Sequence, residues 1–211
     1  KLRELLRANR WFAVVLLLEA AVLASLAASL FGSPYKLQLT SADFSNDYPQ
    51  IAAVNEDGTA LQIWNNSEDF VPPEDKAISF STAGSAMRSG AYEVTVQYFS
   101  CETPDTPTFN ALHSAGSLSF SSKGNPSAVR ADTVTLDDCH RTITTRLWVN
   151  YGAKVQDLTA TLTYGEGQLY LYGITLTEQP IYRLTRLVIF VLLAAVLNFV
   201  LLLLFARRDE N

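Results

Sequence analysis

The chain has 211 residues and a net charge of −5, and its apolar residues are concentrated near the two ends. Between residues 35 and 182 it has 8 Lys and Arg against 17 Asp and Glu. Such an acidic surface argues against nucleic acid and anionic lipid headgroups as partners of the central region.

The first apolar segment covers residues 11–32 and contains one ionisable group, Glu19. About 20 residues at 1.5 Å each cross the hydrocarbon core of a bilayer, so this segment is predicted to be a transmembrane helix. A cleaved signal peptide is the alternative, because a basic region precedes the run and small residues end it. The length of the run and the presence of Glu19 favour the membrane helix.

The central region, residues 35–182, shows the period-two alternation of β-strands. In residues 90–100, for example, apolar residues from Tyr92 to Tyr98 alternate with polar ones. Other strands are predicted at residues 35–40, 59–64, 77–82, 117–122, 128–136 and 141–152, with a hairpin at 157–178 and a bulge at Gly173. This pattern predicts an all-β antiparallel sandwich or jelly roll whose first and last strands are neighbours.

Two stretches resemble the galactose-binding-like jelly roll of bacterial carbohydrate-binding modules. They are residues 77–100, AISFSTAGSAMRSGAYEVTVQYFS, and residues 142–178. That family often has a G-x-Y-x-V-x-V-x-Y strand after a turn of small residues, as from Gly90 to Tyr98 here. The resemblance implies the fold and suggests a glycan ligand, but no run here matches the usual calcium site of the family.

Glycan recognition requires an exposed aromatic ring against the sugar and amide or guanidinium groups for its hydroxyls. Two places in the sequence offer this mixture, and their residues are the predicted ligand-binding residues: Trp64, Asn65 and Asn66, and Arg146, Trp148 and Asn150. The alternative is that both tryptophans pack inside the sandwich, because tryptophan is mostly buried in proteins.

The two cysteines, Cys101 and Cys139, both fall in the central region. In an oxidising compartment an even number of cysteines permits a disulfide, so a bridge between them is predicted. It would stabilise the domain by about 4 kcal/mol in the chain-entropy model. The alternative is two unpaired thiols.

No catalytic residue, cofactor or metal is predicted, and this part of the protein is not predicted to be an enzyme. His113 and His140 lack metal-ligand spacing, and no nucleophile or phosphate-binding motif is present. Two acidic clusters could hold structural calcium: Asp43, Asn46 and Asp47, and Asn55, Glu56 and Asp57. Turn chemistry explains both clusters better.

The second transmembrane helix is predicted at residues 184–205. Basic residues precede the first span and follow the second: Lys1, Arg3, Arg7, Arg10, Arg207 and Arg208. The positive-inside rule therefore places residues 1–10 and 206–211 in the cytoplasm and the central domain outside. Arg183 and Arg186 oppose this orientation but are outnumbered.

Glu19 and Asn198 are expected at one depth, about 11 to 12 Å from the inner boundary of the membrane. A protonated Glu19 could hydrogen bond to the Asn198 amide, which avoids an isolated charge in hydrocarbon. Ala20, Ala24 and Ala28 follow at four-residue spacing, which favours close helix packing. The alternative is that Glu19 extends toward the headgroups.

The sequence therefore predicts a bacterial cell-membrane protein with an extracytoplasmic module that recognises or positions glycan or cell-envelope material. Its expected partners are the lipid bilayer, a glycan and other membrane helices, but not nucleic acid. Two alternatives remain open. One is an accessory subunit that binds a membrane protein, and the other is the non-catalytic portion of an envelope-polymer glycosyltransferase or transporter that continues beyond Asn211.

Overall fold

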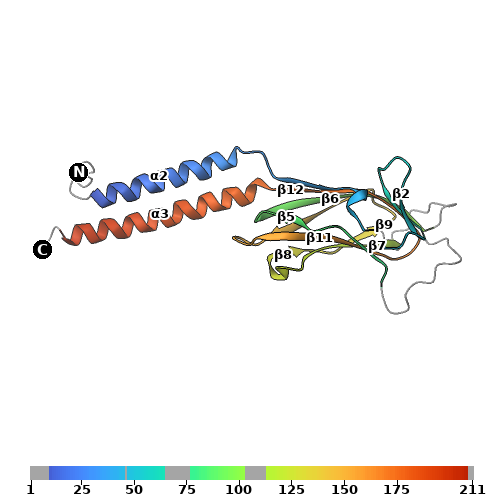
Figure 1. The fold of residues 1–211 in the computed structure, drawn as a ribbon. Helices are drawn as coiled ribbons and strands as arrows, with labels where there is room; N and C mark the ends of the chain where they lie inside the picture. The colour runs from blue at the N-terminus through green and yellow to red at the C-terminus, as the bar shows by residue number, and fades with distance from the viewer. Residues whose placement is uncertain (1–9, 46, 65–76, 103–112, 209–211) are drawn as a thin grey trace. The chain divides into compact units, whose positions relative to one another are not determined.

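The computed structural model describes residues 10–45, 47–64, 77–102 and 113–208 (Figure 1). The chain divides into two compact units. Tyr35–Glu178 form a β-sheet unit, and the segments on either side of it form a helical unit.

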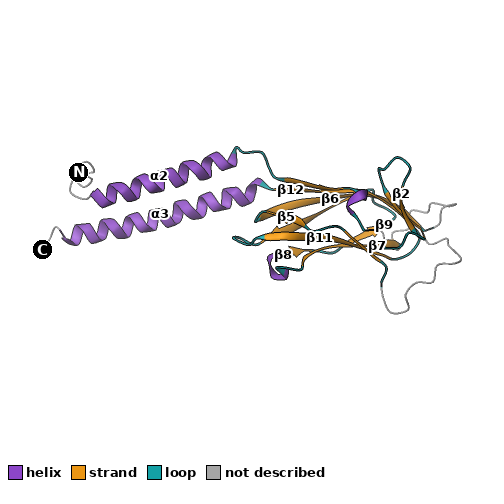
Figure 2. Cartoon of the chain, in the orientation of Figure 1, coloured by secondary structure: helices purple, strands orange, loops and turns teal. Residues whose placement is uncertain are grey.

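The helical unit contains two long apolar helices, α2 (Arg10–Leu30) and α3 (Pro180–Arg208), shown in purple in Figure 2. Both are long and apolar enough to cross a membrane. Helix α3 begins four residues earlier than expected. It starts at Pro180, and proline is favoured in the first turn because its fixed φ suits a helix and its missing N–H has no intrahelical partner there.

Arg183 joins the two helices at the C-terminal end of α2. Its guanidinium donates to the backbone carbonyls of Ser29 (2.7 Å), Gly32 (2.8 Å) and Ser33 (3.1 Å). The last carbonyls of a helix have no intrahelical donor and carry negative partial charge, so a cation satisfies them. This contact gives Arg183 a structural role that the positive-inside rule does not cover.

The β-sheet unit is a sandwich of two antiparallel sheets. The larger sheet has the order β2-β3-β12-β6-β10-β8, with β1 also paired to β12. Its strands are β1 (Lys36–Leu39), β2 (Ala52–Val54), β3 (Leu61–Trp64), β6 (Gly90–Cys101), β8 (Val129–Ala131), β10 (Thr142–Val149) and β12 (Gln168–Glu178).

The smaller sheet has the order β4-β11-β7-β9, and β5 also pairs with β11. Its strands are β4 (Ser79–Ser81), β5 (Ser85–Met87), β7 (Ser114–Ser122), β9 (Val134–Asp137) and β11 (Val155–Tyr164). Two short 3₁₀ helices, η1 (Ser41–Asp43) and η2 (Pro126–Ala128), lie in the connections.

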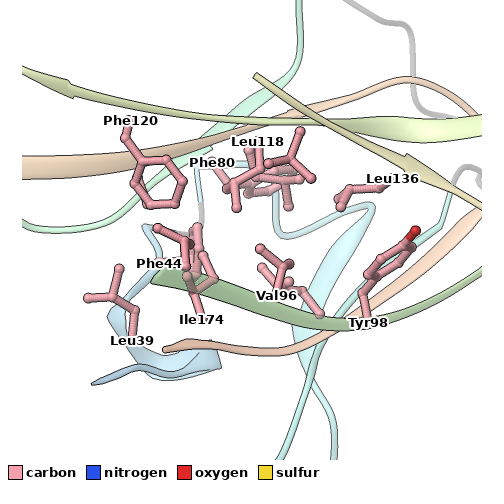
Figure 3. Close-up of a cluster of buried hydrophobic side chains, with 14 of the residues drawn as sticks. Leu39, Phe44, Phe80, Val96, Tyr98, Leu118, Phe120, Leu136 and Ile174 are labelled. Carbon is pink, nitrogen blue, oxygen red and sulfur yellow. The ribbon is translucent and has the colours of Figure 1, made fainter. Parts of the chain in front are cut away.

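The hydrophobic core lies between the two sheets, whose side chains point toward one another in Figure 3. Strand β6 contributes Val96 and Tyr98, and β7 contributes Leu118 from the facing sheet. The alternation of buried and exposed residues along β6 follows the period of a strand, so one face of each sheet is buried.

The predicted antiparallel sandwich is confirmed, and β1 pairs with β12 as expected. The bulge is also present, because the register between β12 and β6 shifts between Leu171 and Gly173. Residues 128–136, expected as one strand, instead contain the end of η2, all of β8 and the start of β9. The hairpin predicted at residues 157–178 is wrong, because its two strands, β11 and β12, belong to different sheets. The short strands β2 and β5 were not predicted, since three residues are too few to show periodicity.

Candidate functional site

The outward positions of the seven-stranded sheet carry an unusual mixture of aromatic, amide, hydroxyl and basic side chains. We call this surface the aromatic face. It consists of Lys36, Gln38, Gln62, Trp64, Glu93, Thr95, Gln97, Phe99, Arg130, Thr142, Thr144, Arg146, Trp148, Tyr170, Thr175 and Thr177. These positions alternate with core residues along their strands, so the pleat places them on one side.

Trp148 lies near the end of the sheet at which the chain enters and leaves the β-sheet unit. It is 45% exposed, so the alternative that it packs inside the sandwich is wrong. Its cross-strand neighbours are Ala91 on β6 and Arg130 on β8, and Arg146 lies two residues before it on the same face. The large indole therefore has a small residue on one side and a guanidinium on the other.

Asn150 has a structural role next to this tryptophan. Its side-chain amide donates to the carbonyl of Ser127 (2.8 Å), and its backbone N–H donates to the carbonyl of Ala128 (2.9 Å). Both bonds hold η2 against the end of β10. The amide N–H groups are therefore partly committed to the fold, which leaves Trp148 and Arg146 as the stronger candidates at this position.

A second aromatic cluster lies toward the other end of the face, and sequence analysis missed it. The rings of Phe99 and Tyr170 are 5.8 Å apart, and the guanidinium of Arg141 lies 3.9 Å from the centre of the Phe99 ring. The Gln62 amide donates to the Tyr170 hydroxyl (3.0 Å). The cluster joins side chains from β3, β6 and β12, whose pairing cannot be deduced from alternation alone.

The bulge in β12 adds an exposed tyrosine beside this cluster. Tyr172 is the extra residue between Leu171 and Gly173, and it is 45% exposed. A Cβ at Gly173 would lie 3.2 Å from the carbonyl oxygen of Leu39, which is tight for a side chain. Glycine at this position lets β1 approach while the bulge redirects Tyr172.

Trp64 is half-buried at the end of β3, opposite Gln168. Asn65 and Asn66 lie outside the described residues. Trp64 and Trp148 share one face but align with opposite ends of β6, at Cys101 and Ala91. Ten residues of strand correspond to about 33 Å, so the two predicted sites are separate and a single sugar ring cannot contact both.

The predicted disulfide between Cys101 and Cys139 is wrong, because both cysteines are free. Cys101 is buried at the end of β6, where its Sγ lies 3.8 Å from Gln168 Oε1. Cys139 is exposed in the β9–β10 turn, which Asp137 fixes by accepting from the Cys139 backbone N–H (2.9 Å). The buried environment, together with the negative charge of Asp138, raises the pKa of the Cys101 thiol.

A buried polar cluster joins β6, the residue before β7 and the β9–β10 turn. The Ser100 hydroxyl donates to Asp138 Oδ1 (2.7 Å), and Asp138 Oδ2 lies 2.8 Å from His113 Nδ1. All three residues are buried. Because the serine is hydrogen-bonded to the aspartate rather than to the histidine, the histidine is not placed to activate its hydroxyl as a base would. The cluster links three chain segments.

The outer face of the smaller sheet has a different composition. In three consecutive rows its outward positions are all serine or threonine: Ser79, Ser81, Ser117, Ser119, Ser121, Thr135, Thr159, Thr161 and Thr163. We call this surface the hydroxyl face. It carries no aromatic or charged side chain in these rows, so it offers no stacking surface for a sugar ring.

Asn55 and Asp43, one residue from each cluster considered for calcium, hydrogen-bond to the backbone of their own turns. Asn55 Oδ1 accepts from the N–H groups of Thr59 (2.8 Å) and Ala60 (2.9 Å). Asp43 accepts from the backbone N–H of Thr40 (2.6 Å) at the start of η1. Across the described ranges no cluster of three His, Cys, Asp or Glu suits a metal ion. Asn46 lies outside them.

In the helical unit, Glu19 and Asn198 lie in contact. The Asn198 amide donates to Glu19 Oε2 (2.7 Å), so Glu19 faces α3. By contrast Ala20, Ala24 and Ala28 are exposed along α2, away from this contact. The small residues expected to pack with Glu19 therefore lie on a different face of the helix.

No protein-family model and no curated protein sequence matches the chain. Among solved structures, it is similar to the C-terminal CBM6 of the laminarinase LamC from Zobellia galactanivorans. The identity is 12% over 68% of this chain and 100% of that one, with a TM-score of 0.41. The carbohydrate-binding module CBM6cm-2 of Cellvibrio mixtus lichenase 5A, in complex with cellotriose, is 11% identical over 68% and 97%, with a TM-score of 0.39.

A third similar structure is the low-affinity xylan-binding module CBM86 from Roseburia intestinalis. It is 10% identical over 69% of this chain and 96% of that one, with a TM-score of 0.40. What those modules bind is a property of their own surfaces, and the ligand of this chain depends on its own aromatic face.

Proposed function

We propose that the β-sheet unit binds glycan on its aromatic face, and that α2 and α3 hold it in a bacterial cell membrane. In this topology both chain ends are cytoplasmic and the β-sheet unit lies outside. The observation that carries the proposal is the contrast between the two outer faces of the sandwich. Exposed aromatic rings, amides and guanidinium groups gather on one face, and hydroxyls alone occupy the central rows of the other.

This mixture suits a sugar for a direct physical reason. The apolar side of a pyranose ring packs on an aromatic ring, and its hydroxyls need donors and acceptors around that ring. Trp148 and Tyr172 supply exposed rings, and Phe99 and Tyr170 form a pair with an attached amide and guanidinium. A glycan chain laid along the strands would reach both ends of the face.

The test is binding of the full chain, in detergent micelles, to an array of neutral and charged polysaccharides. Trp148→Ala and Tyr170→Ala are expected to weaken binding about tenfold or more each, because a central aromatic anchor often contributes that much. Thr163→Ala on the hydroxyl face is the matched control and should bind as the parent does. Failure of the parent to bind any glycan would contradict the proposal.

The membrane topology needs its own test. A protease added to intact cells should cleave within the β-sheet unit, whereas a cysteine reagent confined to the cytosol should leave the exposed Cys139 unmodified. The reverse pattern would place this unit inside the cell and would remove the proposed topology.

A second candidate function is that of an accessory subunit that binds a membrane protein. One observation favours it: Ala20, Ala24 and Ala28 form an exposed small-residue line on α2 that α3 does not cover. Small residues let helix backbones approach closely in a membrane. Ala24→Leu should reduce recovery of an identified membrane partner in mild detergent, and Val22→Ala is the control at a neighbouring exposed position.

A further inference from the structure

Four of the eight basic residues between positions 35 and 182 lie at the aromatic face. Three of its outward positions are Lys36, Arg130 and Arg146, and the guanidinium of Arg141 lies over Phe99. Among the outward strand positions that form this face, Glu93 alone is acidic. The charge of this face is therefore opposite in sign to that of residues 35–182, which have 17 acidic and 8 basic residues in all.

The two arginines beside Trp148 are available for a ligand. Both are exposed, and neither makes a side-chain hydrogen bond or an ion pair with any residue of the described ranges. Glu93 is the cross-strand neighbour of Arg146, but no salt bridge joins the two side chains. A guanidinium forms paired hydrogen bonds with a carboxylate or a phosphate group, so each arginine can accept one anionic group.

We propose that the ligand of the aromatic face is an acidic polysaccharide, which carries carboxylate or phosphodiester groups along its chain. This inference rests on the proposed glycan-binding function and names the class of glycan. Arg130 and Arg146 pair with the anionic groups, while Trp148 packs against an adjoining sugar ring.

The length of the face indicates a polymer rather than a single sugar. Trp148 is aligned with Ala91 on β6, and Phe99 with its arginine lies eight residues further along that strand. Eight residues of strand correspond to about 27 Å, the length of several sugar units. Cationic groups therefore lie at both ends of the face.

The middle of the face suits sugar hydroxyls. Gln38, Thr175, Thr95 and Thr144 follow one another across four adjacent strands in a single row. This row offers neutral donors and acceptors between the two cationic ends. The hydroxyls of a sugar chain can pair with such a row.

Composition alone argued against anionic partners, and the structure shows why that argument does not extend to this face. The argument treats the charge as uniform over the surface. Charges further apart than about 8 to 10 Å are largely screened at physiological ionic strength. Acidic residues beyond this distance therefore have little effect on a ligand seated between Arg130 and Arg146, and Glu93 and Asp132 are the acidic residues next to these arginines in register or sequence.

The test compares matched charged and neutral polymers on the full chain in detergent micelles. The probes are polygalacturonate, its fully methyl-esterified neutral form, and a poly(glycerol phosphate). The parent is expected to bind one or both charged polymers at least tenfold more tightly than the neutral form, with a preference that falls as salt rises. Arg130→Gln combined with Arg146→Gln should reduce that preference about tenfold, because two exposed charge pairs are lost. Lys123→Gln, an exposed substitution elsewhere, is the control.

The outcomes separate this inference from the proposed function. Equal binding of charged and neutral polymers would overturn the acidic class while leaving glycan binding intact. No binding of any polymer, charged or neutral, would overturn both. Phosphatidylglycerol added to the micelles that displaces the polymer from the parent but not from the double variant would reassign the face to lipid headgroups and overturn the inference.

Discussion

The two outer faces of the sandwich are built on strands of the same kind and differ only in what their outward side chains offer. On the hydroxyl face, Thr161 lies between Ser81 and Ser119, and such rows need no further explanation than solubility. Trp148 on the aromatic face and Tyr172 in the bulge beside it are each 45% exposed. Exposed aromatic side chains gathered on one face are typical of interaction sites, so the contrast supports the aromatic face as the proposed binding site without reference to any relative.

The largest expected effect is on stability, and it compares a core residue with a surface residue of strand β11. Leu162 is fully buried, and Thr163 next to it belongs to the hydroxyl face. Leu162→Ala should lower the free energy of unfolding by about 2 to 5 kcal/mol, whereas Thr163→Ala should change it by less than about 0.5 kcal/mol. Urea unfolding followed by tryptophan fluorescence measures both. Similar losses of unfolding free energy in the two variants would mean that the hydroxyl face is buried against another part of the protein or a partner.

Exchanging side chains between the two faces tests whether the aromatic rings themselves bind glycan. Phe99→Thr removes the ring that contacts Tyr170 and Arg141, and it should weaken glycan binding about three- to tenfold. The reciprocal change, Thr163→Phe, places a ring on the hydroxyl face and should add no binding. Isothermal titration calorimetry with a polysaccharide that the parent binds measures the affinity of both variants. A gain from Thr163→Phe would show that any exposed ring suffices.

Asn150 separates structural from ligand-binding residues on the aromatic face. Asn150→Ala removes the bond to Ser127 and should cost about 1 kcal/mol of stability. It should leave glycan affinity close to that of the parent, in contrast to Trp148→Ala. Thermal unfolding and glycan binding, measured on the same sample, separate a loss of stability from a loss of affinity. A loss of affinity without a loss of stability would mean that Asn150 contacts the ligand.

The smallest effect concerns Asp157, beside the hydroxyl face. Its carboxylate accepts from the Ser122 hydroxyl and the Gly124 N–H, and these hydrogen bonds hold its pKa below the ordinary value of 3.8. A lowered folded-state pKa stabilises the protein above 3.8, and this contribution is lost as the pH falls through the folded pKa. Below pH 3.8 the parent should therefore lose slightly more stability than Asp157→Asn, as measured by acid titration of unfolding.

Sequence analysis predicted the fold well because alternation is a local property. The alternation of Tyr92, Val94, Val96 and Tyr98 requires only neighbouring positions, and so does the parity break at Gly173. The pairing of β3, β6 and β12 is not local, and it creates the Phe99 and Tyr170 cluster. A site composed of side chains from three strands therefore cannot be predicted until the strand order is known.

The errors have the same origin. Cys101 and Cys139 both lie near strand ends, which made a bridge plausible, but one is buried and the other is exposed in a separate turn. The direction of a side chain at the end of a strand depends on its three-dimensional neighbours. Likewise, the composition of residues 35–182 gives the net charge of this region. It does not show that basic side chains lie at the aromatic face while the region as a whole is acidic.

The two polar contacts of the helical unit have a mechanical consequence. Arg183 donates to the carbonyl of Ser29 near the end of α2 and to that of Gly32 just after it, and Glu19 contacts Asn198 about 15 Å further along that helix. Two attachment points at different heights fix the rotational phase of one helix against the other. A rotation of either helix about its axis would then be transmitted to the other, so the two helices would rotate together rather than independently.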